Sequence, residues 1–324
     1  MHVLFLGNSQ LVNRRLLPSL ASLPQITRVS VARFGEKPWP TTPPPVPCHR
    51  YDGFEEAERH CQPDIVYVST VNSAHHECAA RWLERGCHVI VDKPATLRPQ
   101  DTQSLVALAT RHNVLLAEAT VYTYHPQIAL LRSLFAPGGP RQATVQFAFP
   151  PLDPGNFRYR ADLGGGAVLD TAAYAASVGR VFFGSLPSTV AAVCGERTPE
   201  GLCVAYSTLM QYPGGKTMIG HFGFRSEYIN RLHLAGESMS AQIDRVFTTP
   251  EDLGNPIHVQ KQNLRSTVHA EPANAFACFF RAVFRALEQR RFEAFAHDML
   301  FDATVTEQLQ RQLAPAERDA TTCR

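Results

Sequence analysis

Five short apolar runs in the first 120 residues, each followed by a segment with helical spacing, constrain the fold more than any other feature of this sequence. The runs are HVLFLG (2–7), RVSVA (28–32), DIVYVST (64–70), HVIV (88–91) and LLAEA (115–119). Between the runs, apolar residues recur three and four positions apart, as Ala79, Trp82 and Leu83 do. Strands that alternate with helices predict a parallel, doubly wound sheet.

The pattern changes after residue 120. One helical segment (125–135) precedes the strand QATVQFAF, and a glycine-rich segment and a helix follow. Five alternating runs then succeed one another without helices between them, with PGG at 213–215 as a tight turn, and two helical segments come last. We expect an α+β domain with a large, mostly antiparallel open sheet. The predicted division is a dinucleotide-binding domain at 1–120, a substrate-binding and oligomerisation domain at 121–312, and a flexible tail at 313–324.

Composition narrows the classes of partner. The chain has 324 residues, 44% hydrophobic and 19% charged, with a formal net charge of +2, so neither nucleic acid nor an anionic membrane is an expected partner. No apolar stretch is long enough to span a membrane and no basic segment precedes an apolar leader, so we expect a cytoplasmic protein. Eight cysteines stand singly, without metal-ligand spacing, and we expect free thiols and no metal.

The end of the first strand predicts a phosphate-binding turn. Gly7 is followed by Asn8, Ser9, Gln10 and Leu11 and then by a helical segment, an arrangement that can direct backbone amides at a pyrophosphate. Ser9 and Val12 replace two glycines of the usual G-x-G-x-x-G pattern, so an ordinary strand-to-helix turn is the alternative.

Arg33 stands after the second strand, where an acidic residue would bind a ribose 2′-hydroxyl. A guanidinium suits a 2′-phosphate, which favours NADP, with NAD possible. The alternative is a solvated arginine at the end of a strand.

Three later segments carry a family resemblance: STVNSAHHECAARWLERGCHVIVDKPATL, AEATVYTYHPQ and YRADLGGGAVLDTAAYAASVGRVFFG. In their order and spacing they resemble the family of glucose-fructose oxidoreductase, inositol dehydrogenase and rhizopine catabolism proteins (Gfo/Idh/MocA), over nearly the whole chain. Within it, the NADP-dependent ketoreductases of nucleotide-linked deoxysugars look most similar. The resemblance implies a Rossmann-type N-terminal domain, and the site residues that follow.

The resemblance assigns roles to two motifs. In the family's (E/D)-K-P motif, Asp92, Lys93 and Pro94 place the lysine over the nicotinamide. In its G-G-G-x-x-x-D-x-G-x-(H/Y) motif, Asp170 and Tyr174 lie four apart and so on one helix face. The expected catalytic residues are Lys93, Asp170 and Tyr174. Tyrosine, with an ordinary pKa of about 10, can exchange a proton with a substrate oxygen, and a neighbouring ammonium favours the phenolate.

Further contacts are expected around this centre. Residues Thr70, Asn72 and His75 match the family's loop before the lysine strand, with Val71 in place of a proline, and we expect them and Glu118 to contact the cofactor. A surface histidine is the alternative for His75. Tyr124, His125 and Arg158 are expected at the substrate, with ordinary surface polar residues as the alternative.

The resemblance implies an NAD(P)-dependent oxidoreductase that moves a hydride between nicotinamide and a sugar or sugar-nucleotide carbonyl or alcohol, most simply a keto-sugar reductase. A non-catalytic dinucleotide-binding sensor and a reductase of an imine or tetrapyrrole-like substrate remain alternatives. Ala172, in place of the motif's glycine, is a further departure. An open antiparallel sheet needs cover on both faces, and family members commonly pair these sheets, so a homodimer or homotetramer is expected.

Overall fold

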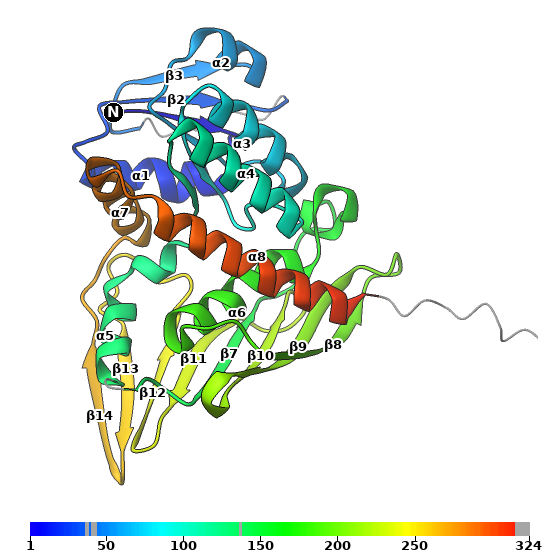
Figure 1. Ribbon diagram of the computed structural model, residues 1–324, viewed down its shortest axis with the longest axis vertical. Coiled ribbons are helices and arrows are strands. Elements are labelled where there is room, and N and C mark those ends of the chain that lie inside the picture. The colour runs from blue at the N-terminus through cyan, green and yellow to red at the C-terminus, as the bar shows by residue number, and fades with distance from the viewer. Residues whose placement is uncertain (36–38, 40–43, 136–137, 315–324) are drawn as a thin grey trace, which may run out of the picture.

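The structure, a computed structural model, describes residues 1–35, 39, 44–135 and 138–314. Two sheets dominate the fold, and helices pack on both faces of the first and on one face of the second (Figure 1). The predicted fold class is therefore confirmed.

The first sheet contains six parallel strands in the order β3-β2-β1-β4-β5-β6. They are β1 (His2–Leu6), β2 (Arg28–Ala32), β3 (Cys48–Tyr51), β4 (Ile65–Val68), β5 (His88–Val91) and β6 (Leu116–Glu118). The strand order reverses at β1, between β2 and β4, and a doubly wound sheet binds its ligand at such a point, beyond the carboxyl ends of the strands. Five of these strands were predicted and β3 was not.

Alternate residues of the first sheet enter two different apolar clusters, as the period of two in a strand requires. Val3 and Phe5 face one side with Phe280, whereas Leu4 and Leu6 face the other with Trp82. The helical segment after β1 comprises a π-helix (Val12–Leu16), α1 (Leu17–Ser19) and a 3₁₀ turn (Leu20–Ser22). The other side holds α2 (Phe54–His60), α3 (His75–Glu84) and α4 (Pro99–His112).

The second sheet has eight strands in the order β14-β13-β12-β11-β7-β10-β9-β8. They are β7 (Gln142–Ala148), β8 (Thr189–Arg197), β9 (Cys203–Tyr212), β10 (Lys216–Gly223), β11 (Ile229–Ala235), β12 (Met239–Asp244), β13 (Pro256–Lys261) and β14 (Leu264–His269). All neighbours are antiparallel except β7 and β10. The turn Pro213–Gly215 joins β9 to β10 as predicted, and β13 and β14 were not predicted.

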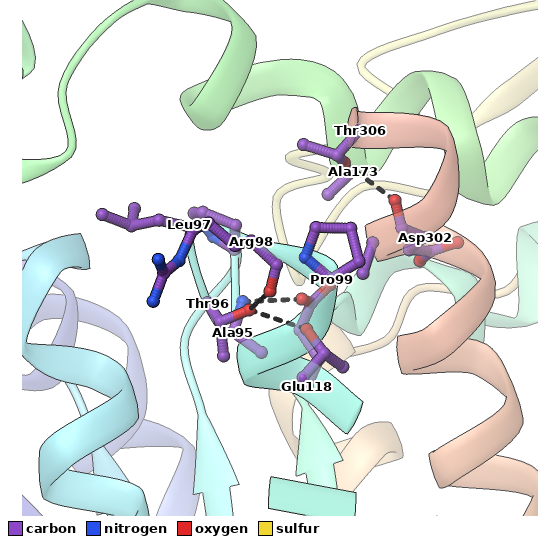
Figure 2. A pocket seen from close by; sticks show the side chains of 12 residues that line it. Ala95, Thr96, Leu97, Arg98, Pro99, Glu118, Ala173, Asp302 and Thr306 are labelled. Carbon is purple, nitrogen blue, oxygen red and sulfur yellow. Dashed lines mark hydrogen bonds between the residues drawn. The ribbon is translucent and has the colours of Figure 1, made fainter. Parts of the chain in front are cut away.

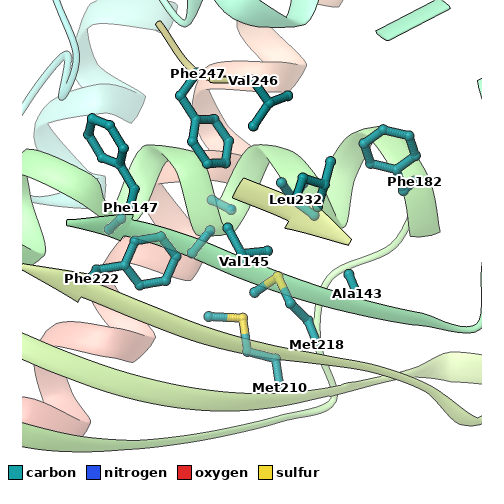
Figure 3. Packing of buried hydrophobic residues seen from close by; sticks show 14 of the residues in the cluster. Ala143, Val145, Phe147, Phe182, Met210, Met218, Phe222, Leu232, Val246 and Phe247 are labelled. Atoms are coloured by element: carbon teal, nitrogen blue, oxygen red, sulfur yellow. The ribbon is translucent and has the colours of Figure 1, made fainter. Parts of the chain in front are cut away.

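One face of this sheet is covered by helices. Figure 3 shows Met218, Phe222 and Leu232 between the strands and α6 (Ala167–Phe183). Residues of α8 (Glu293–Leu313) and α5 (Pro126–Leu134) join the same apolar cluster. Short 3₁₀ turns at Asn72–Ala74, Val121–Tyr124, Phe157–Tyr159 and Ala161–Leu163 connect these elements.

The last two helices tie the sheets together. Phe279 and Phe280 of α7 (Ala275–Gln289) belong to the cluster of β1 and β4, and α8 contributes Phe295, Met299 and Phe301 to three different clusters. In Figure 1, α8 crosses between the upper and lower parts of the molecule. The domain division at residue 120 stays a prediction. Leu313 is buried at the end of α8, and residues 315–324 of the expected tail lie outside the described residues.

Candidate active site

Lys93 and Asp170 meet although 77 residues separate them. Lys93 follows β5 and so lies at the carboxyl edge of the parallel sheet. Its Nζ donates to Asp170 Oδ1 at 2.9 Å and to the Asp170 backbone oxygen at 2.5 Å. Asp170 lies in the first turn of α6, and its side chain is only 8% exposed. The sequence motifs that contain these two residues are therefore adjacent in space.

Asp170 is an anion between two cations. Arg158 Nε lies 3.0 Å from its Oδ2, on the side away from Lys93. Burial alone would raise the pKa of Asp170, but the charges of Lys93 and Arg158 outweigh it and hold that pKa well below the usual range. Burial of Lys93 disfavours its charged form and by itself would lower its pKa. The charge of Asp170 outweighs burial and raises the pKa of Lys93 above its ordinary value. All three groups are therefore charged at neutral pH.

Tyr174 lies one helical turn after Asp170, with the Lys93 Nζ 5.2 Å from its ring centroid. Its ring contacts those of Phe147 and Phe247, at centroid distances of 4.8 and 4.7 Å. Burial outweighs the opposing charge of Lys93, so the pKa of Tyr174 is raised. This differs from the expectation that the ammonium would favour the phenolate. Tyr174 is a protonated phenol at neutral pH, suited to donating a proton.

The three glycines before α6 allow close approach of two loops. A Cβ at Gly164 would lie 2.7 Å from Asn72 Cβ, and one at Gly165 would lie 2.6 Å from the Arg158 oxygen. Asn72 donates from Nδ2 to the Gly164 oxygen at 2.8 Å. Asn72, expected to contact the cofactor, thus fastens the loop after β4 to the start of α6.

The loop that follows Lys93 is held by buried groups. His75 is fully buried, so the surface alternative for it is wrong, and its Nδ1 lies 2.8 Å from the Pro94 oxygen. Because a carbonyl only accepts, Nδ1 carries the proton, and Nε2 makes no hydrogen bond among the described residues. Burial lowers the pKa of His75 and keeps the ring neutral.

Glu118 and Asp92 also support this loop. Glu118 Oε2 accepts from the Ala95 backbone at 2.7 Å, and Oε1 accepts from Thr120 at 2.7 Å. Figure 2 shows Glu118 below Ala95, in a recess that Asp302 of α8 also lines. Asp92 accepts from the hydroxyls of Tyr67 and Ser69. These carboxylates, expected at the cofactor, are used to position the segment around Lys93.

The turn after β1 lies at the carboxyl edge of the parallel sheet, against the end of β4. Gly7 has φ +107°, and a Cβ there would lie 2.1 Å from the Ser69 oxygen, so only glycine permits β1 and β4 to end this close together. The Ser9 hydroxyl accepts from the Val12 amide and lies 2.8 Å from the Ser69 hydroxyl. Gln10 and Leu11 begin the helical segment and Asn8 is buried. Gly7–Leu11 and Thr70 therefore stand at the switch point of the sheet, where a pyrophosphate would bind.

Arg33 lies after β2, at the same edge of the sheet. Its Nε is 2.7 Å from Asp52 Oδ1, and its guanidinium lies over the Trp39 ring at 5.1 Å. Asp52 is an acidic neighbour that sequence reasoning missed, because it follows the unpredicted strand β3. Arg33 is not a simply solvated arginine, and its side chain keeps 24% exposure.

Tyr124 and His125, expected at the substrate, contact residues outside the Lys93–Asp170 pair. Tyr124 packs on Phe279 and Phe295. His125 is buried; its Nδ1 accepts from the Gln127 backbone amide and its Nε2 contacts the Ala273 oxygen. Nδ1 of His125 thus caps α5, and Nε2 ties the start of α5 to the segment before α7. Only Arg158 and Tyr174 of the expected substrate residues reach the centre.

Metal sites and membrane-spanning helices were sought in the part of the chain that the structure describes. Within it, no cluster of His, Cys, Asp and Glu side chains has the arrangement of a metal site. None of its helices combines the length and apolarity needed to cross a membrane.

Both halves of the chain match known protein families. Residues 17–120 match the model of the oxidoreductase family with an NAD-binding Rossmann fold, and residues 136–242 match the GFO/IDH/MocA C-terminal domain. A dTDP-3,4-didehydro-2,6-dideoxy-alpha-D-glucose 3-reductase of Saccharopolyspora spinosa is 30% identical over 262 residues, 80% of this chain and 79% of that protein. The enzyme of the same name from Streptomyces violaceoruber is 28% identical over 288 residues, 86% of this chain and 84% of that protein.

A solved structure supports the same relationship. The crystal structure of a 3-ketoreductase from Actinomadura kijaniata, in complex with NADP and TDP-benzene, superposes with a TM-score of 0.86 at 25% identity. The superposition covers 96% of this chain and 97% of that chain. The likeness therefore extends over both sheets.

Proposed function

The chain belongs to the GFO/IDH/MocA family of oxidoreductases, and from this membership we infer that it reduces a keto group of a nucleotide-linked deoxysugar with NADPH. It is an NAD(P)-dependent enzyme that acts on a sugar carbonyl or hydroxyl group. The observation that carries the finer proposal is the convergence of Lys93, Asp170 and Tyr174 at the carboxyl edge of the parallel sheet. The 3-ketoreductase relatives support reduction as the direction.

In this proposal, side chains of the protein donate the proton to the substrate oxygen and stabilise the negative charge that develops on it. NADPH, when bound, supplies the hydride that reduces the carbonyl carbon. Tyr174 donates its proton to the substrate oxygen as negative charge develops there, and its raised pKa keeps that proton available at neutral pH. Lys93 stabilises the developing charge, and Asp170 holds the Lys93 ammonium in position.

The proposed cofactor site follows the same edge of the sheet. Gly7–Leu11 would receive the pyrophosphate, and Arg33 would pair with the 2′-phosphate that distinguishes NADP from NAD. Thr70, in the loop after β4, and His75, the first residue of α3, would lie toward the nicotinamide end of this path. Arg158, paired with Asp170, is the substrate-side cation of the proposal.

Turnover and binding together test the proposal. We expect the purified protein to oxidise NADPH in the presence of a dTDP-linked 3-keto-deoxysugar. Lys93→Met should lower kcat by roughly 10²–10³-fold and Tyr174→Phe by about 10²–10⁴-fold, while NADPH affinity by titration changes little. Lys216→Met, which removes an ammonium at the start of β10, is the matched control and should retain activity.

Three results would contradict the proposal. Tight NADPH binding without oxidation by any keto sugar would identify a dinucleotide sensor. Reduction of an imine or tetrapyrrole-like compound instead would identify a different substrate class. Full turnover by the Lys93→Met variant would refute the assigned mechanism.

We also propose that the enzyme is a homodimer or homotetramer that works in the cytoplasm. The support for assembly is an apolar patch on the open face of the second sheet, formed by Val193, Leu209 and Ile219, which are 71%, 50% and 57% exposed. Leu209 pairs directly with Ile219 across β9 and β10, and Val193 lies on the neighbouring strand β8, two positions from the residue opposite Leu209. A second copy of the same sheet would cover it.

A further inference from the structure

Two cysteine thiols of the second sheet are in contact. Cys194 of β8 and Cys203 of β9 have their sulfur atoms 3.1 Å apart. Cys203 is buried, Cys194 is half-buried, and both pack against the apolar cluster between the sheet and α6. Among the described cysteines this is the one pair for which a sulfur–sulfur contact is present.

The two cysteines stand at the two ends of an irregular stretch of the β8–β9 ladder. Cys194 is opposite Tyr206 and Arg197 is opposite Cys203, and the register shifts twice between these pairs. The second shift offsets the first, so the register is the same at both ends of this stretch, and the ladder is irregular only at Glu196, which is opposite Ala205. Sequence spacing alone could not reveal the contact, because residues nine apart meet only when both the hairpin and its bulge are known.

We propose that Cys194 and Cys203 form an oxidation site that closes into an intramolecular disulfide when the protein meets a peroxide. The sulfur atoms need to approach by about 1 Å to reach the bond length of about 2.05 Å. The proposal is independent of the assigned catalytic activity.

The chemistry balances in two steps. The Cys194 thiolate attacks hydrogen peroxide, the O–O bond breaks, and a sulfenic acid and hydroxide form. The Cys203 sulfur then attacks the Cys194 sulfur, the S–O bond breaks, and a disulfide and water form. In sum, two thiols lose two protons and two electrons, and one peroxide becomes two waters.

The surroundings set the order and rate of these steps. Burial raises the pKa of the Cys203 thiol to about 12, so the half-buried Cys194 is the residue that a peroxide reaches first. Cys203 then acts as the resolving thiol, and its raised pKa makes closure slow.

The bond would fix a strand end that touches the catalytic helix. Leu202 and the Cys203 backbone oxygen lie beside Gly166, where an added Cβ would be 3.1 Å from Leu202 Cδ1 and 3.4 Å from that oxygen. Gly166 precedes α6, and its oxygen accepts from the Asp170 amide. Oxidation would therefore stiffen the β8–β9 hairpin at its contact with the start of α6.

Peptide mapping tests the proposal directly on the wild-type protein. After treatment of the folded protein with hydrogen peroxide and alkylation of the remaining thiols, trypsin cleaves at Arg197, between the two cysteines. The peptides 181–197 and 198–216 should then be found joined, two hydrogen atoms lighter than their sum, and should separate on reduction. The midpoint of thermal unfolding should rise by about 3–5 °C on oxidation, because the bond closes a short loop in the unfolded chain.

Variants make the test specific. Cys194→Ser and Cys203→Ser should each abolish the joined peptide and the thermal shift. Cys278→Ser, which removes a half-buried thiol of α7, should retain both. If both thiols stay alkylatable, if Cys194 is oxidised further while Cys203 remains a free thiol, or if the shift persists without Cys194, the proposal is wrong.

Discussion

Asp170 is the residue on which the electrostatics of the candidate site depend. It balances Lys93 and Arg158 in a buried position, and its negative charge also opposes ionisation of Tyr174. A neutral side chain at this position would leave both cations without their counter-charge. The phenol would then lie beside an uncompensated ammonium.

The Asp170→Asn variant should therefore change the pH profile of the enzyme. Removing the carboxylate removes a cause that raises the pKa of Tyr174 and leaves Lys93, which lowers it. The phenol then ionises at lower pH, so the alkaline fall of kcat/KM in the reducing direction should move to lower pH than in the wild type. Steady-state rates across the alkaline range measure this, with circular dichroism as the check of folding. An unchanged alkaline limb would contradict proton donation by Tyr174.

Arg33 should decide between the two nicotinamide cofactors. Arg33→Ala removes the guanidinium proposed to pair with the 2′-phosphate, and a hydrogen bond to a charged group contributes about 1.5–3 kcal/mol. KM for NADPH should rise roughly 10–100-fold, and KM for NADH should change little. Arg111→Ala, on the exposed end of α4, is the control. Equal effects on both cofactors would place the 2′-phosphate elsewhere.

Much of the candidate site could be predicted from the identities and spacing of its residues. The motifs that contain Lys93, Asp170 and Tyr174 predicted groups that the fold brings together. Tyr124 and His125 look equally polar in the sequence, but apolar packing and helix capping use them. Sequence spacing does not record which side of a buried segment faces a cleft.

At the scale of secondary-structure elements, the meeting of β1 and β4 depends on one glycine. Gly7→Ala would bring a Cβ to 2.1 Å from the Ser69 oxygen at a φ of +107°. We expect a loss of about 2–4 kcal/mol in the free energy of unfolding, because strain and overlap add. Gly53→Ala, at an extended position with no atom within 4 Å of the added Cβ, should change it by less than about 1 kcal/mol. Urea unfolding of both variants measures the difference.

The strands that the sequence analysis missed share a physical character. β3, β13 and β14 have few buried side chains, and in β14 nearly every residue is exposed. β3 and β14 are held mainly by backbone hydrogen bonds to a neighbour and show no apolar alternation, and the alternation of β13 is limited to the buried Ile257 and Val259. The position of β7 between β10 and β11 is equally hidden, because it joins strands that are distant in the sequence.

At the scale of the whole molecule, the open face of the second sheet predicts assembly. Ile219→Lys places a charge in the apolar patch of Val193, Leu209 and Ile219, directly opposite Leu209, and it should convert the oligomer to smaller species. Light scattering measures the mass. Leu264→Lys, at a more exposed apolar position in β14, is the control and should leave the mass unchanged. A monomeric wild type would contradict the proposed assembly.

The late helices have a consequence for how this chain is made. Phe279 and Phe280 complete the apolar layer under β1, which is synthesised before every other strand of the two sheets, and α8 supplies side chains to all three large apolar clusters. Neither sheet can close its core while residues 275–313 are still unsynthesised. The nascent polypeptide must therefore carry exposed apolar surface until residue 313 has left the ribosome, and it depends on chaperones during that interval more than a chain whose domains fold one after the other.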